Sequence, residues 1–271
     1  MLSCRARSPA RYALVAAAAM AASVLLFTAS PAGASGARYV ALGDSYSSGL
    51  GAGGYSGGSC YRSSHAYSEV WASANAPSSF AFVACSGATT TDVINSQLAA
   101  VSSATSLISI TIGGNDVGFA SVMETCVLGS NSDCVSAVSN AENQARTVLP
   151  GKLGTLFADI RRDAPSAHVV VLGYPEFYDL ARSSGCIGLS TTKRKALDGG
   201  ADVLDSVIKA ETGNFGGFTY ADVISAFAGH EICDSSSWLH SVDWTFLTDS
   251  YHPTAAGQAS GYEPVLARAA G

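Results

Sequence analysis

A serine, an asparagine and a histidine, far apart in this chain, carry the side chains that acyl transfer requires. Ser45 follows an apolar run and a glycine, Asn115 follows a second apolar run and two glycines, and His252 lies near the C-terminus. Serine hydrolysis needs a hydroxyl nucleophile, a base within hydrogen-bond reach, a group that orients the base, and donors for the developing oxyanion. We therefore predict that Ser45 is a nucleophile and that His252 is its base.

The other parts of such a site can be assigned from neighbouring residues. Asp249 stands three residues before His252 and can reach the second ring nitrogen. The backbone N–H groups of Ser45 and Gly87, together with the side-chain amide of Asn115, are the predicted oxyanion donors.

These residues meet only if the fold brings distant segments to one edge. Apolar runs alternate with helical patterns, which predicts a parallel sheet with helices on both faces. The carboxyl ends of neighbouring strands in such a sheet lie together, and reactive groups collect there. The predicted strands are 39–42, 80–84, 107–112, 168–172 and 218–221. The predicted helices are 67–74, one through 100 capped by Thr91 or Asp92, 133–149, 152–162, 191–211 and 255–269.

Two glycine-containing stretches have competing interpretations. The stretch 43–45, Gly-Asp-Ser, consists of ordinary turn residues, so by itself it does not identify a nucleophile. The stretch 49–54 matches the dinucleotide pattern G-x-G-x-x-G. Its glycines start too far past the strand, no helix opens on them, and the next strand ends without an acid for a ribose. We expect a loop on the substrate side there.

Residues 1–34 have the three parts of a secretory signal peptide. Arg5, Arg7 and Arg11 form a basic region, 12–27 is an uncharged apolar run, and 32–34 is a small-residue cleavage site. The apolar run is short for a membrane span, and no second run of that length follows. We expect one secreted domain of residues 35–271 without a stable membrane anchor.

The chain is acidic, with 21 Asp and Glu residues, 15 Lys and Arg residues and a formal net charge of −6 at pH 7. All of the acids follow the predicted signal peptide, so the mature chain is more acidic still. Scattered basic residues in an acidic chain argue against nucleic-acid binding and against docking on anionic membranes.

Six of the seven cysteines follow the signal peptide. An even count in a secreted chain indicates disulfides formed in an oxidising compartment. We favour the pairing of sequence neighbours, because each bond would tie a loop back to a sheet edge: Cys60–Cys85, Cys126–Cys134 and Cys186–Cys233. A zinc site is the alternative, but the chain has no C-x-x-C and no Cys–His cluster with ligand spacing. No metal is expected.

Four ordered blocks of the chain together resemble the SGNH/GDSL hydrolase family. They are Gly-Asp-Ser at 43–45, the glycine at 87, Gly-Gly-Asn-Asp at 113–116 and Asp-x-x-His at 249–252. The match is closer to a secreted bacterial branch, the extracellular lipases and phospholipases A1, through VALGDSYSSG at 40–49, ACSGA at 84–88, TIGGND at 111–116 and SYHPT at 250–254. The resemblance spans nearly all of 35–271.

The resemblance implies a flavodoxin-like three-layer α/β/α sandwich with a central parallel sheet, the SGNH hydrolase fold. It implies a secreted, monomeric serine hydrolase that cleaves carboxylic esters of lipids through a Ser-His(-Asp) acyl-enzyme, with no cofactor. The branch carries six cysteines in three disulfides. Some members hold the histidine with a main-chain carbonyl two residues before it, which is Ser250 here, so Asp249 and Ser250 are both candidates for orienting His252.

Two other functions remain open. The same machinery also serves carbohydrate esterases of the acetyl-xylan type. A catalytically inactive secreted binding module is the third hypothesis, against which the intact Ser45, Asn115 and His252 argue.

Several further residues have alternative roles. Asp44 and Asp116 are predicted to brace their turns, and four histidines are predicted to be structural or without an acid partner: His65, His168, His230 and His240. Four apolar residues before the histidine block either line an acyl site or cover the edge of the sheet: Trp238, Trp244, Phe246 and Leu247.

Overall fold

The computed structural model describes Met1 and residues 36–56, 58–182, 186 and 188–271. The predicted signal peptide therefore lies outside the described residues, apart from Met1. The described residues from Gly36 to Gly271 belong to one compact unit. In the described part of the chain, no helix is long and apolar enough to span a membrane.

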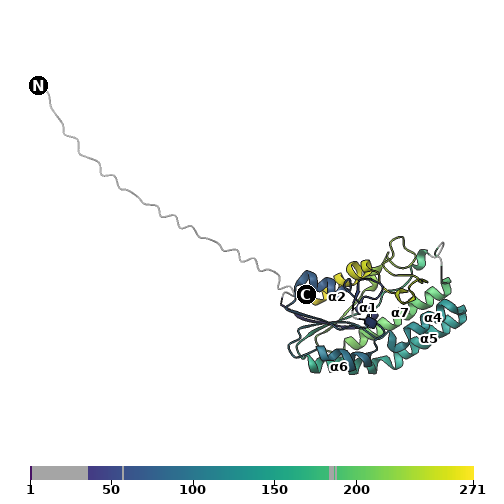
Figure 1. The fold of residues 1–271 in the computed structure, drawn as a ribbon, viewed down its shortest axis with the longest axis horizontal. Helices are drawn as coiled ribbons and strands as arrows, with labels where there is room; N and C mark the ends of the chain where they lie inside the picture. The colour runs from purple at the N-terminus through teal and green to yellow at the C-terminus, as the bar shows by residue number, and fades with distance from the viewer. Residues whose placement is uncertain (2–35, 57, 183–185, 187) are drawn as a thin grey trace. The chain divides into compact units, whose positions relative to one another are not determined.

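Five parallel strands form the central sheet (Figure 1). In chain order they are β1 (Arg38–Gly43), β4 (Ser79–Phe82), β5 (Leu107–Thr111), β6 (His168–Leu172) and β7 (Phe218–Ala221). Their spatial order is β4-β1-β5-β6-β7, which is the flavodoxin-like order. Strands β2 (Tyr55–Ser56) and β3 (Arg62–Ser63) form a separate antiparallel pair. All five predicted strands are confirmed, with ends that shift by at most two residues.

Helices cover both faces of the sheet, as the predicted three-layer sandwich requires. Helices α4, α5, α6 and α7 pack together on one face, and α2 packs with α9 on the other (Figure 1). The α-helices are α1 (Ser45–Ser48), α2 (Tyr67–Asn75), α3 (Thr90–Asp92), α4 (Phe119–Leu128), α5 (Asn131–Thr147), α6 (Leu149–Asp163), α7 (Thr191–Thr212), α8 (Ile224–Phe227) and α9 (Glu263–Ala270). The shorter helical turns are η1 (Gly58–Cys60), η2 (Val93–Gln97), η3 (Leu98–Ala100), η4 (Asn115–Val117), η5 (Leu180–Arg182), η6 (Leu247–Asp249) and η7 (Gly257–Tyr262).

The inner strands of the sheet are buried because a layer of helices covers each face. All five residues of β5 are buried, and only the first residue of β6 is partly accessible. Parallel strands covered on both sides lose all contact with water, so they read as continuous apolar runs in the sequence.

Local capping accounts for several helix boundaries. Ser130 accepts a hydrogen bond from the backbone of Asp133, whose carboxylate accepts in return from Ser130, and α5 therefore begins earlier than predicted. Thr89 and Asp92 form the same reciprocal pair at the start of α3, so neither Thr91 nor Asp92 is the N-terminal cap expected there. Pro150 lies in the first turn of α6, where a missing N–H costs nothing.

Helix α4 is the main element that the sequence patterns did not predict. It begins after Gly118, whose φ is 79° and which offers no side-chain cap. Seven of the ten residues in its segment, FASVMETCVL, are apolar, and the polar residues Ser121, Glu124 and Thr125 form only a narrow strip on one face, so the amphipathic pattern is weak.

Three disulfides join Cys60 to Cys85, Cys126 to Cys134 and Cys186 to Cys233. These are the neighbour pairs favoured above. The first ties the loop after α1 to the end of β4, and the second joins α4 to α5.

Candidate active site

The turn that carries Ser45 is shaped by its neighbours at the end of β1. Gly43 has a φ of 122°, and a β-carbon there would collide with the Thr111 carbonyl oxygen, so only glycine fits. The N–H of Asp44 donates to the same carbonyl at 3.0 Å. The Asp44 carboxylate then accepts from the Tyr46 N–H at 2.9 Å and caps α1. Ser45 is therefore held at the carboxyl edge of the sheet.

The structure brings Ser45 and His252 together across 207 positions of sequence. Nε2 of His252 lies 2.8 Å from Oγ of Ser45, within hydrogen-bond distance. Both residues are buried, with 7% and 8% of their surfaces exposed. Burial lowers the pKa of His252 from 6.5 to about 4, because a charged imidazolium loses its hydration there. The imidazole is therefore neutral at pH 7 and can accept a proton.

The second ring nitrogen identifies the tautomer. Nδ1 of His252 lies 3.0 Å from the Ser250 carbonyl oxygen. A carbonyl can only accept, so Nδ1 carries the hydrogen and the neutral ring presents an unprotonated Nε2 to Ser45. The Ser45 hydroxyl is then the donor in the hydrogen bond to His252.

A tight turn aims the Ser250 carbonyl at the ring. The N–H of His252 donates to the Asp249 carbonyl at 3.1 Å, and Ser250 has φ −55° and ψ 132°. Tyr251 follows with a φ of 63°, so the turn has the backbone of type II. Glycine is favoured at this position, and Tyr251 is held there because its carbonyl accepts from the Tyr46 hydroxyl at 2.7 Å.

Asp249 does not occupy the orienting position that was one of two expectations. Its carboxylate accepts a hydrogen bond from the Tyr55 hydroxyl at 3.2 Å, and the His252 ring bonds to the Ser250 carbonyl. The reason is geometric: Asp249 ends η6, and the turn after it places its backbone, and not its side chain, beside His252. The alternative through Ser250 agrees with the observed contact.

The three residues expected to supply oxyanion donors line one cavity. Ser45, Gly87 and Asn115 all line the cavity that contains His252. Neither the Ser45 N–H nor the Gly87 N–H has a hydrogen-bond partner among the described residues. One N–H of the Asn115 amide donates to the Ala88 carbonyl at 3.0 Å, which fixes the side chain and leaves its second N–H available.

Tyr174 connects the nucleophile turn to the asparagine loop. Its hydroxyl donates to the Asp44 carboxylate at 2.5 Å and accepts from the Gly114 N–H at 3.0 Å. Burial raises the pKa of Asp44 to about 7, while the Tyr174 hydrogen bond acts in the opposite direction. The sequence patterns did not single out this residue. Its position in the sequence could have identified it, because Tyr174 comes just after β6, at the same edge of the sheet as Ser45.

A cavity of about 410 Å³ opens beside Ser45 and His252. Much of its remaining lining is apolar and comes from α4 and from residues 242–247, which end at the start of η6: Phe119, Met123, Val127, Leu128, Val242, Trp244 and Leu247. Trp244 and Leu247 are 70% and 62% exposed, so they border the cavity and do not cover the sheet. Such a space suits an apolar group attached to a reacting carbonyl.

The glycine-rich stretch 49–54 is not part of this lining, contrary to the expected substrate-side loop. A β-carbon on Gly51 would lie 2.7 Å from the Pro253 carbonyl oxygen, so this stretch packs against the histidine segment. Nε2 of His240 donates to the Gly51 carbonyl at 2.8 Å and joins the two. Gly51 therefore packs against the segment that carries His252.

The other polar candidates have structural partners. The Asp116 carboxylate accepts from the Thr90 backbone and hydroxyl and pairs with Lys152 at 3.1 Å, so it braces its turn as predicted. The remaining three histidines bond or stack locally: His65 on the Ala52 carbonyl, His168 on the Thr219 hydroxyl and His230 on the Trp238 ring. In the described residues, no group of three or more His, Cys, Asp or Glu residues is arranged to hold a metal ion.

Comparison with known proteins identifies relatives along most of the chain. The model of the GDSL-like Lipase/Acylhydrolase family matches residues 41–259. The chain is 53% identical over 259 residues to Lipase 1 of Streptomyces coelicolor, covering 95% of each protein. It is 49% identical over 230 residues to a lipase of Streptomyces rimosus, covering 84% of this chain and 85% of that one.

Two solved structures have the same fold. The crystal structure of phospholipase A1 from Streptomyces albidoflavus has a TM-score of 0.82 and 54% identity, over 85% of this chain and 98% of that chain. The extracellular lipase of Streptomyces rimosus has a TM-score of 0.83 and 47% identity, over 86% and 99%. The chain therefore belongs to the GDSL-like Lipase/Acylhydrolase family and is an ester hydrolase.

Proposed function

We propose that this protein is a secreted lipase that cleaves carboxylic esters of lipids through an acyl-enzyme on Ser45. The observation that carries the proposal is the 2.8 Å contact between Ser45 Oγ and a neutral His252, beside a largely apolar cavity. The names of the relatives, lipase and phospholipase A1, support lipid esters as the substrate class.

The first half of the reaction forms the acyl-enzyme. His252 Nε2 takes the proton of the Ser45 hydroxyl as Oγ attacks the ester carbonyl carbon. The negative charge then forms on the carbonyl oxygen, near the N–H groups of Ser45, Gly87 and Asn115. When the tetrahedral intermediate collapses, His252 returns the proton to the leaving alcohol.

The second half of the reaction hydrolyses the acyl-enzyme and uses the same groups. His252 removes a proton from water, and the hydroxide attacks the acyl-enzyme carbonyl. Collapse releases the fatty acid, and the proton returns from His252 to Ser45 Oγ. The Ser250 carbonyl holds the ring throughout and stabilises the imidazolium that exists transiently.

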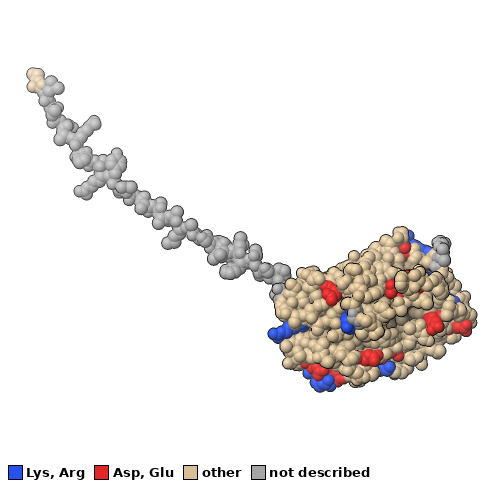
Figure 2. All heavy atoms as spheres, viewed as in Figure 1, with Lys and Arg blue, Asp and Glu red and all other residues tan. Residues whose placement is uncertain are grey.

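Secretion, the monomeric state and the absence of nucleic-acid partners are parts of the same proposal. Three disulfides suit an oxidising compartment. On the face drawn in Figure 2, Lys and Arg side chains are scattered among acidic ones and most of the surface is uncharged. Such a surface offers no basic stripe for a nucleic-acid backbone. Residues 1–34 are proposed as the signal peptide and 35–271 as the mature domain.

The test is a product profile of the purified protein on phosphatidylcholine, tributyrin and acetylated xylan, measured side by side. Release of fatty acid from either lipid, with little acetate from xylan, is expected. Acetate release from xylan alone would favour the carbohydrate esterase hypothesis, and no turnover of any ester would favour the inactive binding module.

A further inference from the structure

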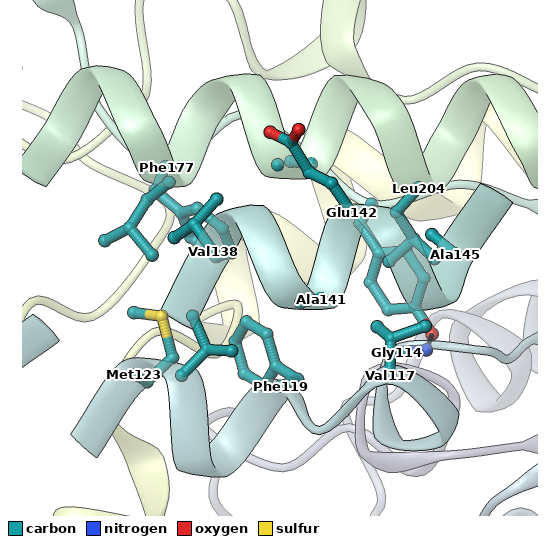
Figure 3. Close-up of a pocket in the computed structure, with 15 residues that line it drawn as sticks. Gly114, Val117, Phe119, Met123, Val138, Ala141, Glu142, Ala145, Phe177 and Leu204 are labelled. Atoms are coloured by element: carbon teal, nitrogen blue, oxygen red, sulfur yellow. Dashed lines mark hydrogen bonds between the residues drawn. The ribbon is translucent and has the colours of Figure 1, made fainter. Parts of the chain in front are cut away.

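A second, smaller cavity, whose lining residues are drawn in Figure 3, shares part of its lining with the catalytic cavity. It has a volume of about 60 Å³ and lies among α4, α5 and α7. Phe119 and Met123 of α4 line both spaces. Their side chains therefore form a shared wall between the small cavity and the one that contains Ser45.

The small cavity has an almost wholly apolar lining. Besides the shared wall, it is formed mainly by six side chains of α5 and α7: Val138, Ala141, Ala145, Leu197, Ala201 and Leu204. Glu142 is the one charged residue in the lining. Tyr174 also lines this space, and its hydroxyl is bonded to Asp44 and Gly114. Few polar groups remain to hold water, so the space favours an apolar occupant.

We propose that this cavity receives the distal end of a long acyl chain whose ester group lies at Ser45. The inference rests on the proposed lipid-ester function and assigns a new subsite to it. A methylene group is similar in size to a water molecule, which takes about 30 Å³ of liquid volume, so the cavity of about 60 Å³ admits about two of them. Short acyl chains end within the larger cavity and do not reach it.

The wall between the two cavities contains a side chain that can change its conformation. The unbranched thioether side chain of Met123 has three rotatable bonds and repacks readily. The helix that carries it begins at Gly118 without a side-chain cap, whereas its other end is tied to α5 by the Cys126–Cys134 disulfide. Phe119, in the first turn of α4, packs against Tyr46, whereas Met123 lies one turn further from Ser45. A change of the Met123 rotamer therefore joins the two cavities.

Chain-length preference then depends on a residue that does not line the catalytic cavity. Ala141 is half-buried on α5 and lines only the small cavity (Figure 3). Ala141→Leu fills that cavity. The matched control is Ala137→Leu, the same change one turn earlier on α5, at a half-buried position outside both linings.

The experiment measures kcat/KM on p-nitrophenyl butyrate, octanoate, laurate and palmitate for the wild type and both variants. Each methylene that leaves water contributes about fourfold to kcat/KM, so Ala141→Leu is expected to lower the laurate-to-butyrate ratio by about tenfold or more. Butyrate turnover and the Ala137→Leu ratio are expected to stay within about twofold of the wild type.

The failure of this inference differs from the failure of the proposed function. A wild-type laurate-to-butyrate ratio in Ala141→Leu would overturn the acyl subsite while leaving lipid-ester hydrolysis intact. No turnover of any of the four esters by the wild type would contradict the proposed function, and the subsite with it.

A second measurement uses the wild-type protein, so it does not depend on whether a variant folds. A crystal structure of the wild type inactivated by a dodecyl phosphonate should show the alkyl tail between α4, α5 and α7. A tail that runs outward past Trp244 would overturn the subsite.

Discussion

The Ser250 carbonyl oxygen lies 3.0 Å from Nδ1 of His252, in the position where a catalytic triad would place a carboxylate. A main-chain carbonyl carries no net charge and does not titrate. It orients the ring and stabilises the protonated imidazole less than a buried carboxylate would. Burial lowers the pKa of His252, and because the Ser250 carbonyl is neutral it does not fully offset this effect, so the pKa falls to about 4.

Replacing Asp249 with asparagine should therefore have a small effect. The amide that replaces the carboxylate would keep an oxygen for the Tyr55 hydroxyl, and the Ser250 carbonyl would remain on His252. We expect kcat to fall by less than about tenfold, as for the loss of one neutral hydrogen bond. His252→Ala, measured beside it, should lose about 10⁴-fold or more. A loss in Asp249→Asn as deep as that of His252→Ala would establish a true triad.

The lowered pKa of His252 predicts that the enzyme stays active to a low pH. The base must be unprotonated, so kcat/KM on a soluble ester should be constant near pH 7 and fall as the pH drops, with a midpoint of about 4. Circular dichroism at each pH separates loss of the base from unfolding. A midpoint at or above the ordinary histidine value of 6.5 would show that burial does not control this group.

The same shift has a consequence for stability. The unfolded chain binds a proton at His252 below pH 6.5, whereas the native state does so only near pH 4. The unfolded state therefore binds more protons in this range, and this residue makes the free energy of unfolding decrease as the pH falls.

Asn115 is expected to matter through the transition state. Asn115→Ala removes a donor aimed at the oxyanion, so kcat should fall by about 10²–10³-fold with little change in KM. Asn75→Ala is a matched control, because the Asn75 amide also bonds a backbone carbonyl, that of Trp71 at 2.9 Å on α2. Equal kcat values for both variants and the wild type would remove Asn115 from the oxyanion site.

Tyr174→Phe tests the link between the nucleophile turn and the asparagine loop. It leaves the buried Asp44 carboxylate with one fewer donor and the Gly114 N–H without its acceptor. We expect a loss of about 1–3 kcal/mol in the free energy of unfolding. We also expect kcat to fall by about tenfold or more, because Ser45 and Asn115 move relative to each other.

Tyr39→Phe is the control for that experiment. The Tyr39 hydroxyl is also buried and hydrogen-bonded, to Ser109 at 2.6 Å, but it lies at the start of β1 and not at the catalytic edge. It should lose stability and retain kcat. If Tyr174→Phe behaves in the same way, Tyr174 is a structural residue only.

The parts of the fold set by periodic apolar burial were predictable from the sequence. The strands at 168–172 and 218–221 were predicted with the bounds that the structure has. In the first, burial of residues 169–172 leaves an uninterrupted apolar run, whereas the second lies at the edge of the sheet and keeps an exposed Thr219. The placement of Ser45 and Asn115 at one edge followed from the rule that the carboxyl ends of neighbouring parallel strands lie together. His252 lies in the loop before the terminal helix, which reaches the same edge.

Features that depend on backbone direction or on packing were not predictable. The choice between Asp249 and Ser250 depends on a turn in which Tyr251 has a positive φ, held by contacts with Tyr46 and Tyr178 that no local pattern encodes. Helix α4 was missed because Gly118 gives no capping signal and only three of its ten residues, Ser121, Glu124 and Thr125, are polar. The second cavity is lined in part by that helix, so it was not predictable from the sequence either.

The most direct test of the role of Ser45 is the kcat/KM of Ser45→Ala on p-nitrophenyl butyrate, with the melting temperature recorded on the same sample. The variant removes one oxygen and keeps the backbone N–H of residue 45, so the fold should remain intact. We predict a melting temperature close to that of the wild type and a loss of about 10⁴-fold or more in kcat/KM. Wild-type turnover by the folded variant would contradict the acyl-enzyme mechanism, because the nucleophile would then be another group.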